Sequence, residues 1–214
     1  MEQSVPLSFD ALDRLGRIRL SQHFFMRDFL YSETAIKHGL INSPSDPALA
    51  EEVGSRLCHE ILEPLQSRFG RLHIRSAFRS AEVNALGNKL RLNCARNEAN
   101  YAAHIWDQRD SAGNMGATAC IVIPGVADLL SEPGDWVELA WWIHDNLPYS
   151  TLCFFKALNA CNIQWRQNPV RRIDSYAGWH DGKTWKSQGT LTKAGMPNHH
   201  GDHSRLYPKL SAQS

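Results

Sequence analysis

The chain has 214 residues, of which 43% are hydrophobic and 21% charged, a composition typical of a globular protein. Its 23 Lys and Arg residues nearly balance its 22 Asp and Glu residues, so the formal net charge is +1. Strong binding to nucleic acid or to an anionic membrane surface needs a clear excess of positive charge, so this balance argues against both partners. No run of about 18 apolar residues is present, so no membrane-spanning helix is predicted.

The N-terminal segment lacks a basic stretch followed by an apolar stretch, and this predicts no secretory signal. The sequence has five cysteines, an odd number, and no CxxC spacing. Both features favour a reducing compartment, so we expect a cytoplasmic protein without disulfides. Release by cell lysis is the alternative that this reasoning leaves open.

We divide the chain into three parts by composition. Residues 1–19 form a short amphipathic arm, and residues 20–176 contain the periodic segments expected of a folded domain. Residues 177–214 are rich in Gly, Lys and His and show no period, so we interpret them as a C-terminal tail. The sequence does not indicate an oligomeric state.

A long helix is predicted over Asp46–Phe69. Asp46 can cap its first turn and Pro47 suits the first helical position. Apolar residues recur at a spacing of four, Pro64 is expected to bend the last turns, and Gly70 is expected to end the helix. A strand is predicted over 72–78, followed by a short helix that Ser80 caps and that stops at Gly87.

A hairpin is the strongest local prediction. The segments 101–108 and 116–124 flank a loop in which Gly113 can adopt a positive φ. Pairing them around Ala112 gives one apolar face and places His104 opposite Cys120. An ordinary cross-strand pair, with Cys as a small apolar residue, is the alternative to a shared functional role.

The second half of the chain predicts a helix that begins after Asp135 and ends before Pro148. Two further strands are predicted over 152–155 and 162–165. These elements together favour an α+β fold, in which an antiparallel sheet is covered by helices on one side.

Three segments resemble the zinc-dependent D-alanyl-D-alanine carboxypeptidases, whose fold is shared with the Hedgehog signalling domain. LSQHFFMRDFLYS (20–32) is similar to the family's opening segment. LEPLQSRFGRLHIRSAFRSAEVN (62–84) resembles its helix, strand and SxYRS turn, and GATACIVIPG (116–125) resembles its GxAADIxxPG segment. The resemblance extends over residues 20–166 and implies a Hedgehog/DD-peptidase-like fold.

The resemblance also implies a chemistry. In the family a His and an Asp of the hairpin and a His of a later ExxH-type segment bind one zinc, whose fourth position activates a water molecule. The Glu of that segment moves protons, and the Arg of the SxYRS turn holds the substrate. By this resemblance His104 is the first ligand and Arg79 the anion clamp.

The sequence departs from the family at three positions. Cys120 stands at the Asp position, where a thiolate could still bind zinc. Ile163 stands for the catalytic Glu and Arg166 for the last ligand His, and neither can perform those roles. By elimination, we expect the missing metal ligand from the tail cluster His199, His200 and His203. Asp107 or a carboxylate of the tail would replace the missing base. A solvated tail and a structural Asp107 are the alternatives.

Two hypotheses follow. The first is a zinc metallopeptidase of carboxypeptidase type with a rewired site, acting on a small peptide or peptidoglycan fragment. The second is a non-catalytic binding module that kept the fold and lost the catalytic Glu and His. A zinc ion with an open coordination position would favour the enzyme.

Overall fold

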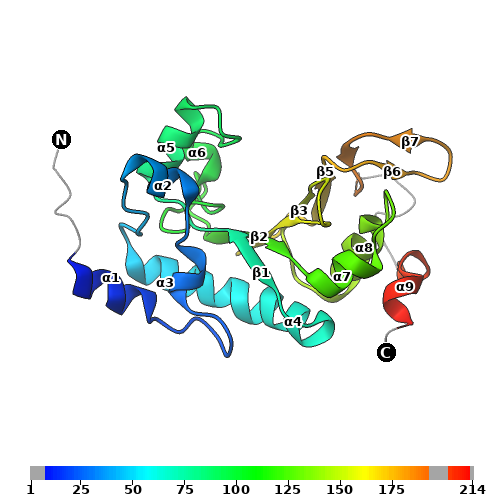
Figure 1. Ribbon diagram of the computed structural model, residues 1–214, viewed down its shortest axis with the longest axis horizontal. Helices are drawn as coiled ribbons and strands as arrows, with labels where there is room; N and C mark the ends of the chain where they lie inside the picture. The colour runs from blue at the N-terminus through cyan, green and yellow to red at the C-terminus, as the bar shows by residue number, and fades with distance from the viewer. Residues whose placement is uncertain (1–7, 193–201, 213–214) are drawn as a thin grey trace. The chain divides into compact units, whose positions relative to one another are not determined.

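The computed structural model describes residues 8–192 and 202–212 and divides into two compact units (Figure 1). Unit 1 comprises the chain up to His59 together with Ser76–Ala119. Unit 2 comprises Glu60–Arg75 and the chain from Cys120 onward. Each unit is therefore built from segments that are distant in sequence.

Unit 1 is mainly helical. Its described helices are α1 (Phe9–Gly16), the 3₁₀ helix η1 (Met26–Phe29), α2 (Glu33–His38), α3 (Pro47–Leu57), α5 (Ala81–Lys89) and α6 (Asn97–Asn100). Side chains at the preceding position cap four of them: Ser8, Ser32, Asp46 and Ser80 each accept a hydrogen bond from a backbone amide of the first turn. The predicted caps at Asp46 and Ser80 are thus confirmed.

The helix predicted over 46–69 is present, but it is interrupted. After α3 the backbone widens into a π-helical segment, η2 (Cys58–Leu62), before α4 (Glu63–Phe69) ends at Gly70. Pro64 has no amide hydrogen and cannot donate to the carbonyl of residue 60, so a regular α-helical ladder cannot pass through this point. The irregularity therefore lies just before the proline that was expected to bend the helix.

An aromatic cluster forms the core of unit 1. Phe29 lies 5.3 Å from Trp106 and 6.0 Å from Phe24, and Phe78 lies 6.2 Å from Trp106, all between ring centroids. Gly54 of α3 allows close packing here, because a Cβ atom at this position would lie 3.1 Å from the Trp106 ring. The segment 20–32 thus contributes buried aromatic side chains, as its composition suggested.

The hairpin prediction is wrong in its first strand. Residues 101–108 form consecutive turns, in which Ala102 has a φ of 52° and the Ile105 amide bonds to the carbonyl of Asn100. Hydrogen bonds within the segment hold these turns, and the Ala103 carbonyl also accepts from the Thr118 amide at 2.9 Å, outside the predicted pairing. Burial also follows no alternation, since Ile105, Trp106 and Asp107 are all buried. His104 therefore has no strand register with Cys120.

A six-stranded sheet has the order β1-β2-β4-β3-β5-β8. Its strands are β1 (His73–Ser76), β2 (Gly116–Val122), β3 (Thr151–Phe154), β4 (Cys161–Arg166), β5 (Arg172–Ser175) and β8 (Gly189–Thr190). β3 pairs with β4 in the antiparallel sense and with β5 in the parallel sense, and β5 is antiparallel to β8. The predicted strands at 72–78 and 116–124 are confirmed with shorter bounds, the strand at 152–155 is shifted by one residue, and the strand at 162–165 is longer by one residue at each end.

Unit 2 adds helices and a small hairpin to the sheet. The helices are α7 (Pro124–Leu129), α8 (Trp136–Asn146), the 3₁₀ helix η3 (Ser204–Leu206) and α9 (Pro208–Ser211), and the hairpin pairs β6 (Trp179–His180) with β7 (Trp185–Lys186). In its core, the Trp136 ring lies 4.7 Å from Phe154 and 5.7 Å from Trp179. Residues after 176, which the composition set apart as a tail, thus supply β6, β7, β8 and α9.

The structure confirms a mixed α/β fold with a six-stranded sheet and helices. The parallel pairing of β3 with β5 differs from the wholly antiparallel sheet that was expected. Among residues 8–192 and 202–212, no helix has the length and apolar character needed to cross a membrane.

Candidate functional site

Arg79 lies in unit 1, in the turn that leads into α5. Asn42 holds this turn from both sides, because its side chain accepts a hydrogen bond from the Ser80 amide (2.8 Å) and donates one to the Phe78 carbonyl (3.0 Å). The Arg79 amide donates to the carbonyl of His104 at 2.8 Å. These contacts fix the backbone at Arg79, whose side chain is half-buried.

Cys94 lies against this guanidinium, with its Sγ 3.4 Å from Arg79 Nη1. One face of α5 holds the Cys94 loop. Asn88 donates to the Cys94 carbonyl (2.7 Å) and Asn84 to the Ala95 carbonyl (3.0 Å). A Cβ atom on Gly87 would lie 2.6 Å from the Cys94 sulfur, so only glycine permits this approach. The sequence analysis missed this contact, although the spacing of residues 84, 87 and 88 places them on one helix face.

His104 is buried beside Arg79. Its Nδ1 lies 2.7 Å from the Ala77 carbonyl oxygen, which only accepts, so Nδ1 carries the proton and Nε2 has the lone pair. Burial, and next the positive charge of Arg79, lower the pKa of His104 to about 3, although the bond to Ala77 opposes this shift. The imidazole is therefore neutral at pH 7.

Asp107 is buried in unit 1, and one of its carboxylate oxygens is bonded to Ser45. Its Oδ2 accepts hydrogen bonds from the Ser45 amide (2.6 Å) and the Ser45 hydroxyl (2.7 Å). Its Oδ1 is buried and has no hydrogen-bond partner in the described part of the chain. Asp107 thus ties the segment before α3 to the turns that contain His104.

Cys120 lies in unit 2 on β2, in electrostatic range of Cys153 and Cys161. Burial, followed by the charges of Asp174 and Cys120, raises the pKa of Cys153 to about 11. Burial raises the pKa of Cys161 well above its ordinary value. Both thiols are therefore protonated at pH 7.

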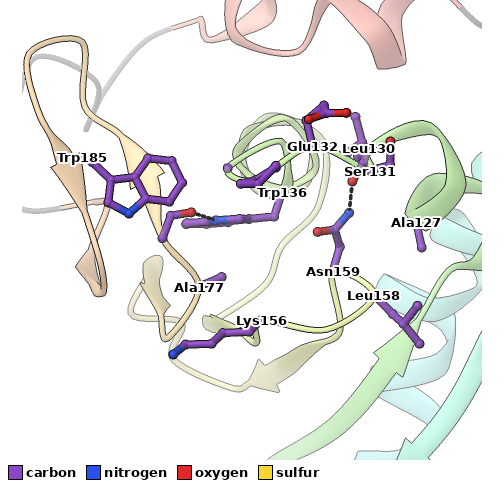
Figure 2. Close-up of a pocket in the computed structure, with 13 residues that line it drawn as sticks. Ala127, Leu130, Ser131, Glu132, Trp136, Lys156, Leu158, Asn159, Ala177 and Trp185 are labelled. Carbon is purple, nitrogen blue, oxygen red and sulfur yellow. Dashed lines mark hydrogen bonds between the residues drawn. The ribbon is translucent and has the colours of Figure 1, made fainter.

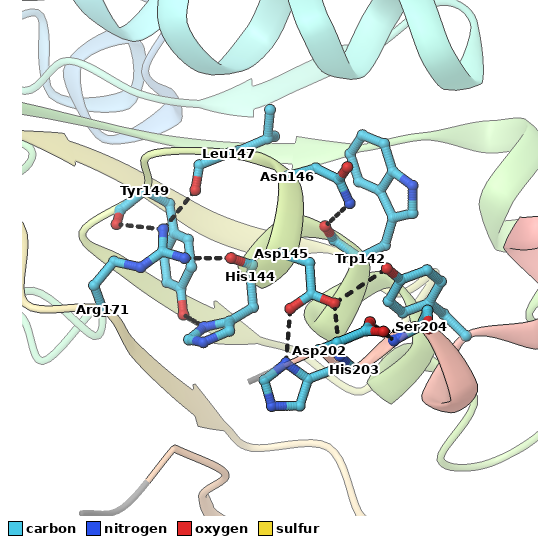
Figure 3. A network of polar contacts seen from close by, with 11 residues as sticks. Trp142, His144, Asp145, Asn146, Leu147, Tyr149, Arg171, Asp202, His203 and Ser204 are labelled. Carbon is cyan, nitrogen blue, oxygen red and sulfur yellow. Dashed lines mark hydrogen bonds and ion pairs between the residues drawn. The ribbon is translucent and has the colours of Figure 1, made fainter. Parts of the chain in front are cut away.

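His203 also lies in unit 2, where Figure 3 shows it beside the end of α8. Its Nδ1 is 2.7 Å from Asp145 Oδ1, and its backbone amide donates to Oδ2 of the same carboxylate at 2.9 Å. The ring stacks on Trp141 at 4.2 Å, and the Tyr207 hydroxyl donates to Asp145 at 3.1 Å. These contacts dock the segment 202–211 onto α8. The other candidate tail ligands, His199 and His200, lie outside the described residues.

Arg171 caps the C-terminal end of α8 in the same region (Figure 3). Its guanidinium donates to the carbonyls of His144 and Leu147, which have no partner within the helix, and lies 4.4 Å from the centre of the Tyr149 ring. The Tyr149 hydroxyl in turn lies 2.7 Å from His144 Nδ1. Arg171 therefore has a structural role, which its sequence position beside Arg172 did not reveal.

The structure brings together some of the predicted site residues and leaves others apart. Arg79 and His104 are neighbours in unit 1, whereas Cys120 and His203 belong to unit 2 and have different surroundings. Ile163 and Arg166 both lie on β4, and Ile163 is fully buried. No group of three or more His, Cys, Asp or Glu side chains suited to a metal ion occurs within the residues that the structure describes.

The arrangement around Arg79 is suited to binding an anion. A guanidinium presents a planar set of donors that matches a carboxylate, and it is half-buried here, which strengthens its electrostatic interactions. Within the described chain, no carboxylate pairs with it. Compared with known protein families, curated proteins and solved structures, the chain matches none.

Proposed function

We propose that this protein is a binding module that recognises the carboxylate of a small peptide through Arg79. The observation that supports this most directly is a half-buried guanidinium that is held in place by its backbone and has no carboxylate partner among the described residues. A buried or half-buried positive charge is ordinarily paired, so an unpaired one points to an anionic ligand.

The neighbours of Arg79 agree with a site that binds an anion rather than a cation. His104 is neutral and offers Nε2 as an acceptor, so it can receive a hydrogen bond from a ligand N–H group. The positive charge of Arg79 repels a metal ion at His104. The resemblance to the D-alanyl-D-alanine carboxypeptidases supplies the ligand class, a short peptide with a free C-terminal carboxylate such as a cell-wall stem peptide.

A zinc peptidase with a rewired site is the second candidate. It is favoured by the lone pair on His104 Nε2 and by the buried Asp107 Oδ1, which has no hydrogen-bond partner in the described chain. A bound metal ion would supply a partner for a buried carboxylate oxygen that has none. This candidate still lacks a general base, because Ile163 stands at the position of the family's glutamate.

The deciding experiment is calorimetric titration of the full chain with D-alanyl-D-alanine and with its C-terminal amide. We expect the free acid to bind and the amide to bind at least about tenfold more weakly, because the amide cannot form the charged pair with Arg79. Arg79→Gln should abolish the difference between the two ligands. Arg96→Gln is the control, because it removes one positive charge from an exposed position of unit 1. It should leave the difference in affinity between the two ligands unchanged.

Two results would count against the binding module. Equal affinity of Arg79→Gln and the parent protein for the free acid would show that the arginine is not the clamp. Zinc-dependent hydrolysis of the dipeptide, lost in His104→Ala, would establish the peptidase instead. The metal content of the same samples shows whether zinc is bound when affinity and hydrolysis are measured.

A further inference from the structure

A cavity of about 430 Å³ in unit 2 has no role in the proposed function (Figure 2). Its wall combines two tryptophans with a few polar groups. The lining residues used below are Trp136, Trp185, Lys156, Glu132, Asn159 and Gly178. The volume lies in the range of sites that enclose a small molecule.

Trp185 is the most unusual residue of this wall. It lies on β7, and 52% of its surface is exposed, although indole rings are usually buried. Its ring lies against the backbone of Gly178, where a Cβ atom would lie only 2.4 Å from the indole, and it approaches Gly134 as well. The two glycines thus support the ring and leave much of its surface open.

The polar groups of the cavity are balanced in charge. Lys156 and Glu132 contribute one positive and one negative charge, and Lys156 forms no ion pair within the described residues. Asn159 has a φ of 50° and donates its amide to the Leu130 carbonyl at 2.6 Å, so its Oδ1 is presented as an acceptor. The wall therefore offers both donors and acceptors without a net charge.

We propose that this cavity binds a neutral saccharide, with one pyranose ring stacked on Trp185. A pyranose has a face of weakly positive C–H groups, which matches the negative face of an indole, and a rim of hydroxyls that both donate and accept. Lys156, Glu132 and Asn159 provide partners for such a rim. A nucleotide fits less well, because its phosphate would need an excess of positive charge that this wall lacks.

A second cavity of about 330 Å³ lies next to the first, since the two share Ala127 and Leu158 in their walls. It also contains His73 and Arg75, both exposed on β1. A ligand that extends from Trp185 past Leu158 would occupy both cavities. The site is therefore suited to a chain of linked sugars, and affinity should rise with chain length.

The test is titration of the full chain with two series of β-1,4-linked oligosaccharides of increasing length, one of glucose and one of N-acetylglucosamine. Binding is followed by calorimetry and by tryptophan fluorescence, with adenosine as a competing planar ligand. We expect at least one series to bind, more tightly as it lengthens, and Trp185→Ala to lower the affinity at least about tenfold. Gly178→Ala should weaken binding as well, because it displaces an intact indole.

The matched control is Tyr176→Ala, which removes another exposed aromatic ring of unit 2 that does not line the cavity. It should bind as the parent protein does, and circular dichroism should show that all three variants fold. The proposal is overturned if neither series binds, if Trp185→Ala binds as tightly as the parent, or if adenosine binds at this site and the saccharides do not. Loss of peptide binding in Arg79→Gln would not affect these results, so the two proposals fail independently.

Discussion

His104 in unit 1 and His203 in unit 2 are both buried, yet their surroundings differ in one respect. His104 donates to a neutral carbonyl and lies beside the positive charge of Arg79, so it stays neutral. His203 lies against the carboxylate of Asp145, which also accepts from Tyr207. Asp145 of unit 2 is thus bonded to side chains of the same unit, whereas Arg79 of unit 1 has no carboxylate partner among the described residues. The charge of the neighbouring group, rather than burial alone, distinguishes the surroundings of the two histidines.

The largest effect that tests this comparison is the pH dependence of stability. The folded pKa of His104 is about 3, below its ordinary value of about 6.5. The unfolded state therefore binds the extra proton between these values, and stability falls by about 1.4 kcal/mol per pH unit as the pH decreases through this window. Denaturant titrations from pH 7 to pH 4 measure it.

His104→Gln should flatten this pH profile, while His73→Gln, which changes an exposed histidine of unit 2, should not. If the slope were the same in the parent and in His104→Gln, the neutral state of His104 would not be the cause. The comparison with His203 would then lose its basis.

The next largest effect is expected from Asp145→Ala. This substitution leaves the His203 amide, its imidazole and the Tyr207 hydroxyl without their acceptor, at a cost of about 3 kcal/mol for the docked segment. Hydrogen exchange of residues 202–211 measures this local opening. Asp202→Ala removes a carboxylate whose hydrogen bonds, among the described residues, go to Ser204, and it should open the segment much less. Equal protection in both variants would refute the docking role.

Gly87→Ala should have a moderate effect. The new Cβ atom would lie 2.6 Å from Cys94 Sγ, and overpacking of this kind costs about 1–3 kcal/mol, partly offset by the better helix propensity of alanine. Thermal unfolding measures the change. Adding Cys94→Ala removes the sulfur and should restore most of the stability. A double variant no more stable than Gly87→Ala would contradict the contact.

The smallest effect is expected from Lys209→Ala. Lys209 pairs with Asp135 at 2.5 Å, but 41% of the lysine side chain is exposed, so the pair contributes less than about 1 kcal/mol. Its contribution should disappear at high salt, which distinguishes it from the buried contacts of Asp145. Thermal unfolding of the parent and the variant at low and high salt is the measurement. A loss as large as that of Asp145→Ala would mean that exposed pairs stabilise unit 2.

Local signals in the sequence predicted much of the secondary structure. Asp46 and Ser80 cap helices because each has an oxygen that can accept from the first turn, and this needs no tertiary contact. The strand at 116–122 was also recognisable. The prediction for residues 101–108 was wrong, because their apolar and polar residues alternate as in a strand although turns with local hydrogen bonds form there.

The candidate site was predictable only in part. Arg79 could be named from its motif, and His104 from the same resemblance, but nothing local shows that the two are neighbours. Cys94 was missed because its position depends on the absence of a side chain at Gly87. Trp185 was missed because exposure of one tryptophan among seven cannot be read from composition.

The sequence by itself determined the helix caps at Asp46 and Ser80, the strands near 73–76, 116–122, 151–154 and 161–166, and the balanced charge. These depend on residue type and on neighbours within a few positions. Only the tertiary structure decided which charges are paired, that His203 docks on Asp145 and that Arg79 has no carboxylate partner in the described chain. Pairing is decided between residues distant in sequence, where burial and the reach of each side chain determine the outcome.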